Sequence, residues 1–98
     1  MKEISTSELA EKKKTEPSIS IVDVREDEEV AEGKIPGAKH IPLGELSERQ
    51  GELDKDKHYY IVCRSGGRSS RACEFLNAQG FHTTNVAGGM LAWEDDVE

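Results

Sequence analysis

The sequence predicts an α/β fold in which a mostly parallel central sheet of about five strands carries helices on both faces. Two observations lead to this prediction. Short apolar and β-branched segments, of which 18–24 and 59–62 are the clearest, alternate with segments that have the composition of helices. The connections between them are short, and strands that alternate with helices in this way normally run parallel.

The N-terminal segments indicate a short strand, a helix and a central strand. Ile4 belongs to the first strand, and Ser5 with Glu8 has the spacing of a capping box, which starts a helix that continues to about Lys14. The segment 18–24 first alternates between polar and apolar residues and then becomes continuously apolar. That pattern is typical of a central strand covered on both faces.

The middle of the chain contributes one strand and two helices. Residues 26–32 indicate a short acidic helix that is closed by Gly33. Residues 35–38 contain proline and glycine and predict a turn, which leads into a brief strand at 39–41. Residues 43–52 are predicted to form another helix before a polar loop.

The C-terminal third contains the two remaining strands. The apolar and aromatic run 59–62 predicts a buried strand, and 81–86 predicts the last one. Between them lies a predicted helix with Ser69 as its N-cap and Gly80 as its C-cap. Residues 87–93 turn into a final short helix. A loop therefore connects the end of one strand to the N-terminus of a helix.

Length and charge limit the classes of function. The chain of 98 residues has room for one domain, which we expect to span residues 1–98. Its net charge of −7 and pI near 5.0 argue against nucleic acid or an anionic membrane surface as a partner. No apolar run resembles a signal peptide or reaches membrane-spanning length, so we expect a cytoplasmic protein.

The cysteines and histidines do not indicate a metal site. Cys63 and Cys73 have none of the usual zinc spacings, and the histidines are scattered, with no partner identified for His40 or His58. We therefore expect no metal and no organic cofactor. Cys73 is interpreted as a core residue, the alternative being a disulfide with Cys63, and Trp93 as a C-terminal core anchor.

Cys63 occupies a position that favours a reactive thiolate. It directly follows the strand 59–62, and Gly66 and Gly67 allow the next residues to turn tightly around the sulfur. Such a loop supplies unpaired backbone N–H groups and the positive end of a helix, which stabilise a thiolate. A small anionic substrate is predicted, because three arginines fall within eight residues of an acidic chain: Arg64, Arg68 and Arg71.

A second group of charged residues follows the strand 18–24. Because parallel strands end at the same edge of a sheet, Asp23 and Arg25 are expected near Cys63. We interpret Asp23 and Arg25 as an internal ion pair or loop brace rather than as direct reactants. The acidic run 27–29 is interpreted as a solvated helix face.

Four segments together resemble a known family. Residues 63–68, Cys-Arg-Ser-Gly-Gly-Arg, are similar to the active-site loop of rhodanese-like sulfurtransferases, whose pattern is Cys-Arg-x-Gly-x-Arg or Thr. Residues 23–26 resemble the strand-ending Asp-x-Arg of that family, and residues 88–93 resemble its closing Gly-Gly-x-x-x-Trp. Residues 33–38 resemble its Gly-His-Ile-Pro-Gly-Ala, with Lys34 in place of the histidine.

The resemblance implies a sulfurtransferase with a rhodanese-like fold. It makes Cys63 the nucleophile that takes sulfane sulfur from thiosulfate or a persulfide, carries it as a persulfide, and passes it to a thiol or to cyanide. The implied partners are a small anionic sulfur donor and a thiol acceptor, which includes a protein thiol. Arg64 and Arg68 are expected to present paired donors to an oxyanion such as the sulfonate end of thiosulfate. The other expected site residues are Ser65, Gly66 and Gly67 for substrate binding, and Asp23, Arg25 and Ser69 for loop support.

Two other functions remain open. One is a phosphatase or arsenate reductase, because related loops in this fold class bind tetrahedral oxyanions. Those enzymes need a cysteine, then five residues, then an arginine. Counted from Cys63, that position is Ser69, and Arg68 comes one residue too early. A domain of this kind also suits a sulfur carrier or binding module without significant small-molecule turnover. That alternative predicts negligible turnover of small molecules but rapid transfer of the Cys63 persulfide to a partner protein.

Overall fold

The computed structural model describes residues 1–98 and contains one sheet of five strands. The strands are β1 Glu3–Ser5, β2 Ser20–Asp23, β3 Lys39–His40, β4 His58–Val62 and β5 His82–Ala87. Their order in the sheet is β1-β5-β4-β2-β3, and every neighbouring pair is parallel. This confirms the predicted α/β fold with a parallel sheet.

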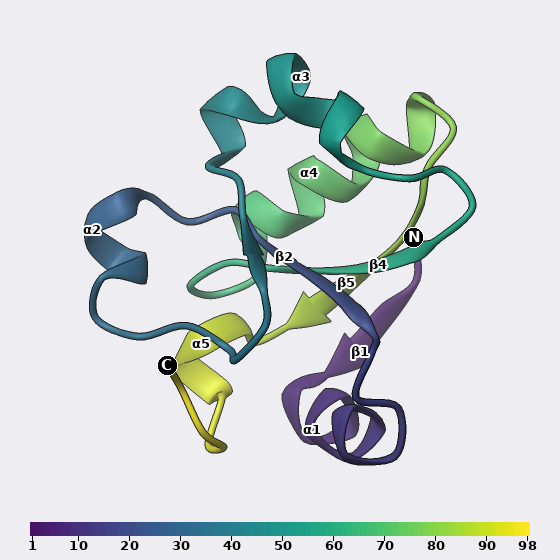
Figure 1. Ribbon diagram of the computed structural model, residues 1–98. Helices are drawn as coiled ribbons and strands as arrows, with labels where there is room; N and C mark the ends of the chain where they lie inside the picture. The colour runs from purple at the N-terminus through teal and green to yellow at the C-terminus, as the bar shows by residue number, and fades with distance from the viewer.

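Helices cover both faces of this sheet (Figure 1). They are α1 Thr6–Thr15, α2 Asp27–Val30, α3 Leu46–Arg49, α4 Gly67–Ala78 and α5 Gly89–Ala92. Figure 1 shows α1 and α5 on one face, α3 and α4 on the other, and α2 beyond one edge of the sheet. None of the helices is long and apolar enough to span a membrane.

Two clusters of buried side chains join the sheet to its helices. The cluster under α4 includes Cys73 and Leu76, and the cluster under α1 includes Leu9, with Trp93 packed against it. Successive residues of the central strands point into different clusters, which explains why those strands are continuously apolar. The predicted core position of Cys73 is confirmed, whereas Trp93 is partly buried and packs against the cluster under α1 from outside.

The first helix begins as predicted, whereas the segment 43–52 differs from the prediction. The Glu8 N–H donates to Ser5 Oγ and the Ser5 N–H donates to Glu8 Oε1, each at 3.1 Å, which completes a capping box. Residues 43–52 form one α-helical turn between two 3-10 turns instead of a continuous helix. Gly44 and Gly51 lie in those 3-10 turns, and glycine disfavours a regular helix.

The helix after the Cys63 loop begins earlier than predicted. Gly66, not Ser69, is the N-cap of α4, and its φ of +111° lies in the left-handed region that favours glycine. Ser69 lies inside the first turn, buried, and its hydroxyl bonds to the loop and the sheet instead of capping the helix. At the other end the cap residue is Gln79, followed by the predicted Gly80 at φ +96°.

Candidate active site at the carboxyl end of strand β4

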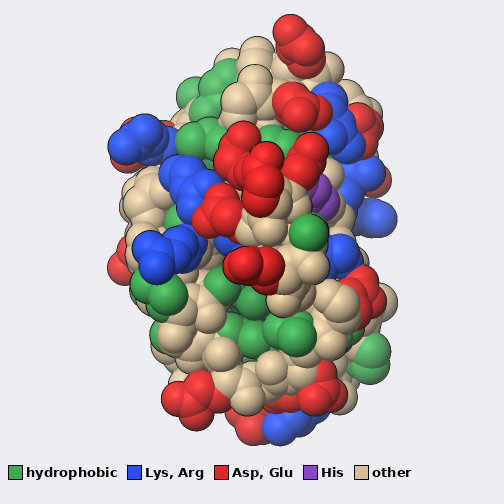
Figure 2. Space-filling view, turned by 90° about the vertical axis from the view of Figure 1, so that its left-hand side faces the viewer, with side chains coloured by type: hydrophobic (Ala, Val, Ile, Leu, Met, Phe, Trp, Pro, Cys, Tyr) green, Lys and Arg blue, Asp and Glu red, His purple; other side chains and the backbone are tan.

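The topology brings the two predicted groups of site residues together. Asp23 ends β2 and pairs with Val62 at the end of β4, so the segment that follows Asp23 lies beside Cys63. Both loops lie at the left-hand edge of the sheet in Figure 1, and Figure 2 views the molecule from this side. The carboxyl ends of parallel strands are the usual place for a ligand in such a sheet.

The sulfur of Cys63 is enclosed by its own loop. The Gly66 N–H donates to Sγ at 3.0 Å, and the Ser69 hydroxyl oxygen lies 3.3 Å from the sulfur. Burial by itself raises the pKa of the Cys63 thiol, but hydrogen bonds from the Ser69 hydroxyl and from the backbone N–H groups of Ser69, Gly66 and Ser65 outweigh it, so the pKa is lowered. The loop therefore favours the thiolate.

Helix α5 fixes the loop from the other side. The Met90 N–H donates to the Cys63 carbonyl oxygen at 2.9 Å, and the Leu91 N–H donates to that of Arg64 at 3.0 Å. A Cβ on Gly89 would overlap the Cys63 oxygen and lie 2.6 Å from the Arg64 oxygen. Gly89 thus lets two consecutive N–H groups reach the backbone of the cysteine loop, which gives a physical reason for the glycine pair in segment 88–93.

A buried polar contact beneath the loop was not predicted. The Ser69 hydroxyl lies within hydrogen-bond distance of both the Cys63 sulfur and Asn85 Oδ1, and its single proton serves one of them at a time. The Asn85 amide donates to the Gly66 carbonyl oxygen at 3.4 Å and to Glu3 Oε2 at 3.3 Å. Asn85 is 3% exposed and lies in β5, so this amide links the sheet to the loop around Cys63. An amide side chain in a predicted buried strand is the signal that could have identified it.

Asp23 and Arg25 form the expected ion pair. Arg25 Nε lies 3.0 Å from Asp23 Oδ1 and Nη2 lies 2.8 Å from Oδ2, and both residues are buried. The same guanidinium donates to the carbonyl oxygens of Glu29, at 3.3 Å, and Gly33, at 2.8 Å. The pair therefore braces α2 against the end of β2.

The two loop arginines have different surroundings. Arg64 is exposed and forms no salt bridge, whereas Arg68 Nη1 and Nη2 donate to Glu29 Oε1 and Oε2 at 2.7 and 2.8 Å. The hydrogen bonds from Arg68 lower the pKa of Glu29 to about 2. The interpretation of 27–29 as a solvated face is therefore wrong for Glu29, because a pairing across 39 positions leaves no local signal.

Both histidines without a predicted partner have one in the structure. His40 Nε2 lies 2.7 Å from the Arg25 carbonyl oxygen, which fixes the residue beside the brace. His58 Nε2 lies 2.6 Å from Thr84 Oγ1, on a neighbouring strand. Lys34, which replaces the family histidine, donates to the Ala38 carbonyl oxygen at 3.0 Å and pairs with the Glu98 carboxylate. No group of three or more His, Cys, Asp or Glu side chains is placed to hold a metal ion.

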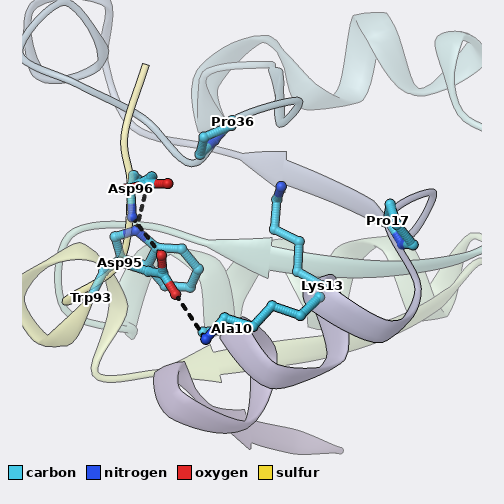
Figure 3. Close-up of a pocket in the computed structure, with 8 residues that line it drawn as sticks. Ala10, Lys13, Pro17, Pro36, Trp93, Asp95 and Asp96 are labelled. Carbon is cyan, nitrogen blue, oxygen red and sulfur yellow. Dashed lines mark hydrogen bonds and ion pairs between the residues drawn. The ribbon is translucent and has the colours of Figure 1, made fainter.

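A separate hollow of about 390 Å³ lies between α1 and the C-terminal segment (Figure 3). The Trp93 indole N–H donates to the Asp96 carbonyl oxygen at 2.9 Å on one side of it, and Lys14 Nζ lies 3.9 Å from Asp95 Oδ2. The Lys13 side chain extends from α1 into the hollow. It contains no residue of the Cys63 loop, so the sulfur site is separate from it.

Comparison with known proteins agrees with this geometry. The family described as Rhodanese-like domain matches residues 5–96 of the chain. The chain belongs to the rhodanese-like domain family. It is 53% identical over 98 residues to the putative sulfurtransferase YtwF of Bacillus subtilis, covering 100% of this chain and 95% of that protein.

Two further relatives show the range of this rhodanese-like family. The chain is 42% identical to the putative sulfur carrier protein YrkF of Bacillus subtilis, covering 98% of this chain and 52% of that protein. It superposes with a TM-score of 0.95 on the crystal structure of a rhodanese-like domain protein from Staphylococcus aureus, at 45% identity, with 100% of this chain and 97% of that chain covered. In the structure, the four segments that resemble the family lie around the Cys63 sulfur and the Asp23–Arg25 pair.

Proposed function

We propose that this protein is a sulfurtransferase that carries sulfane sulfur as a persulfide of Cys63, from thiosulfate or a persulfide donor to a thiol or cyanide acceptor. The observation that carries the proposal is the position of the Cys63 sulfur, with the Gly66 N–H at 3.0 Å and the Ser69 hydroxyl at 3.3 Å. These groups lower the pKa of the Cys63 thiol and so favour the thiolate, which is the form that attacks sulfur. The sulfurtransferase names of relatives point to the same chemistry.

The transfer needs only sulfur nucleophiles and leaving groups. The Cys63 thiolate attacks the outer sulfur of the donor, a new S–S bond forms, and the donor's S–S bond breaks. Sulfite leaves thiosulfate with the electron pair, and a thiolate leaves a persulfide donor. The acceptor then attacks the terminal sulfur of the Cys63 persulfide and regenerates the thiolate. Backbone N–H groups of the loop stabilise negative charge on that terminal sulfur.

A sulfur-carrier role is the second candidate, because the chain is 42% identical to a putative sulfur carrier protein of Bacillus subtilis. In that role the Cys63 persulfide passes its sulfur to a protein thiol. A phosphatase role is disfavoured, because Arg68 is engaged by Glu29 and comes one residue early for gripping an oxyanion opposite the thiolate.

Intact mass measurement tests the proposal. The purified protein is incubated with thiosulfate or with a small-molecule persulfide, and Cys63→Ser and Cys73→Ser are treated in parallel. We expect a gain of one sulfur atom in the wild type and in Cys73→Ser, lost on adding cyanide, and no gain in Cys63→Ser. Sulfur retained by Cys63→Ser contradicts the proposal. Uptake without turnover of any small acceptor supports the carrier role instead.

A further inference from the structure

The pairing of Arg68 with Glu29 changes which N–H groups the cysteine loop can offer to an anionic sulfur donor. Each terminal nitrogen of the guanidinium donates one N–H to one carboxylate oxygen, at 2.7 and 2.8 Å, so the two parallel donors that would grip an oxyanion side by side are taken by Glu29. Paired N–H donors of this kind are what a bound oxyanion needs, so here an internal carboxylate occupies the place expected for a substrate. Arg64 remains as a loop arginine without a salt bridge.

Glu29 is held in place by more than Arg68. The Glu26 N–H donates to Glu29 Oε1 at 3.0 Å, and Arg25 Nη1 donates to the Glu29 carbonyl oxygen at 3.3 Å. Arg25 is itself fixed by Asp23. The carboxylate is therefore positioned by the start of α2 and by the buried brace, unlike a surface ion pair whose two partners both move freely.

The charge near the loop is consequently lower than the arginine count suggests. Glu29 stays ionised near neutral pH, because hydrogen bonds from Arg68 hold its pKa at about 2. Asp27 and Glu28 on the same helix are exposed. Figure 2 shows acidic side chains gathered on this side of the molecule, with Lys and Arg side chains beside them. A doubly charged anion that approaches the Cys63 thiolate thus meets one unpaired loop arginine, Arg64, because the charge of Arg68 is balanced by Glu29.

We propose that Glu29 is a specificity-determining residue, which disfavours dianionic donors such as thiosulfate and leaves Cys63 selective for persulfides without excess negative charge. This inference rests on the proposed sulfurtransferase function. The favoured step joins the Cys63 thiolate to the outer sulfur of R–S–SH, breaks the donor's S–S bond, and releases R–S⁻, which takes the electron pair. With thiosulfate the same step must bring a dianion beside the thiolate, and Arg68 is not free to offset that charge.

The test measures the rate of sulfur uptake on Cys63 from three donors of different charge: cysteamine persulfide, mercaptoacetate persulfide and thiosulfate. In the wild type we expect rates to fall in that order. In Glu29→Gln we expect uptake from thiosulfate to rise about tenfold at low salt, mainly through KM, because Arg68 becomes available. Uptake from cysteamine persulfide should change less than about twofold. The matched control is Glu28→Gln, which removes the same charge from the same helix at an exposed position.

Two further measurements separate charge from loop shape. Glu29→Asp keeps the carboxylate, so thiosulfate should remain a poor donor. In the wild type, added salt should speed uptake from thiosulfate and leave cysteamine persulfide unaffected or slower, because salt screens like-charge repulsion. This last result needs no variant and holds even if Glu29→Gln folds poorly.

Four outcomes overturn the inference. They are an equal loss of rate for all donors in Glu29→Gln, an effect of Glu28→Gln as large as that of Glu29→Gln, a Glu29→Asp variant that gains thiosulfate uptake, and a wild-type thiosulfate rate that falls with salt. Each leaves the sulfurtransferase proposal intact, because sulfur still reaches Cys63. If wild-type Cys63 accepts sulfur from none of the donors, both proposals fail together.

Discussion

Cys63 and Cys73 lie in the same core cluster, are equally buried at 1% and 0% exposed, and differ in almost everything that determines reactivity. Burial raises the pKa of the Cys73 thiol, and the Thr83 contact does not compensate for it. Around Cys63, burial also acts to raise the pKa, but the hydroxyl and N–H donors of its loop reverse the direction. Burial alone thus raises the pKa of a thiol, whereas hydrogen-bond donors around the sulfur can lower it, which is why we propose Cys63 and not Cys73 as the nucleophile.

The largest effect is expected from Gly89→Ala, which displaces the loop of Cys63 and leaves Cys73 untouched. The new Cβ would clash with the Cys63 and Arg64 carbonyl oxygens. We expect a loss of about 3 kcal/mol in unfolding free energy and of most sulfur uptake. Denaturant unfolding and mass measurement check this. Gly37→Ala is the control, because Gly37 also has positive φ, at +81°, but has open space around it and should cost only about 1 kcal/mol.

Removal of one hydrogen-bond donor beside the sulfur should move the pKa of Cys63 in the direction of that of Cys73. In Ser69→Ala the hydroxyl beside the sulfur is lost, so the pKa of Cys63 should rise and sulfur uptake near neutral pH should fall about tenfold. The pH–rate profile checks this, because uptake increases as pH rises through the thiol pKa, and that rise should shift to higher pH. Ser70→Ala is the control, since its hydroxyl contacts Met1 and not Cys63. An unshifted profile would mean that Ser69 does not tune the thiol.

Changing Cys73 should affect stability alone. Cys73→Ala removes a buried sulfur, and we expect a loss of about 1 kcal/mol in unfolding free energy with sulfur uptake unchanged. A large loss of uptake, together with a disulfide between Cys63 and Cys73 in the oxidised wild type, would assign Cys73 a resolving role. Peptide mapping under non-reducing conditions detects such a disulfide directly.

A similarly small effect on stability concerns the Arg68–Glu29 pair at acid pH. The pKa of Glu29 is about 2 in the folded protein and near its ordinary value of 4.5 when unfolded, so its ionisation stabilises the fold above pH 4.5. That contribution is lost as pH falls from 4.5 through about 2. Because Glu29 is about a quarter exposed, we expect the wild type to exceed Glu29→Gln by only about 1 kcal/mol at neutral pH. Unfolding curves that keep this difference at pH 2 would contradict the assignment.

Segments whose signals are local could be predicted from the sequence. The Ser5–Glu8 capping box, the two central strands and the glycine after α4 depend on residues a few positions apart, and the structure contains all of them. The position of Cys63 directly after a strand was also predictable, because the apolar and aromatic run 59–62 ends there. The helix start at Gly66 was not, since the hydroxyl that suggested an N-cap is used elsewhere.

The sequence by itself therefore determined the layer structure and the position of Cys63 at the end of a strand, because strand patterning, capping and loop glycines act over short separations. Only the tertiary structure decided how that cysteine is surrounded. The pairing of Arg68 with Glu29, the Ser69–Asn85 contact and the approach of Gly89 to the loop join segments that are distant along the chain. Their physical reason is common to all three: charged and polar groups that meet at one edge of a parallel sheet must find partners, and the sheet order decides which partners are within reach.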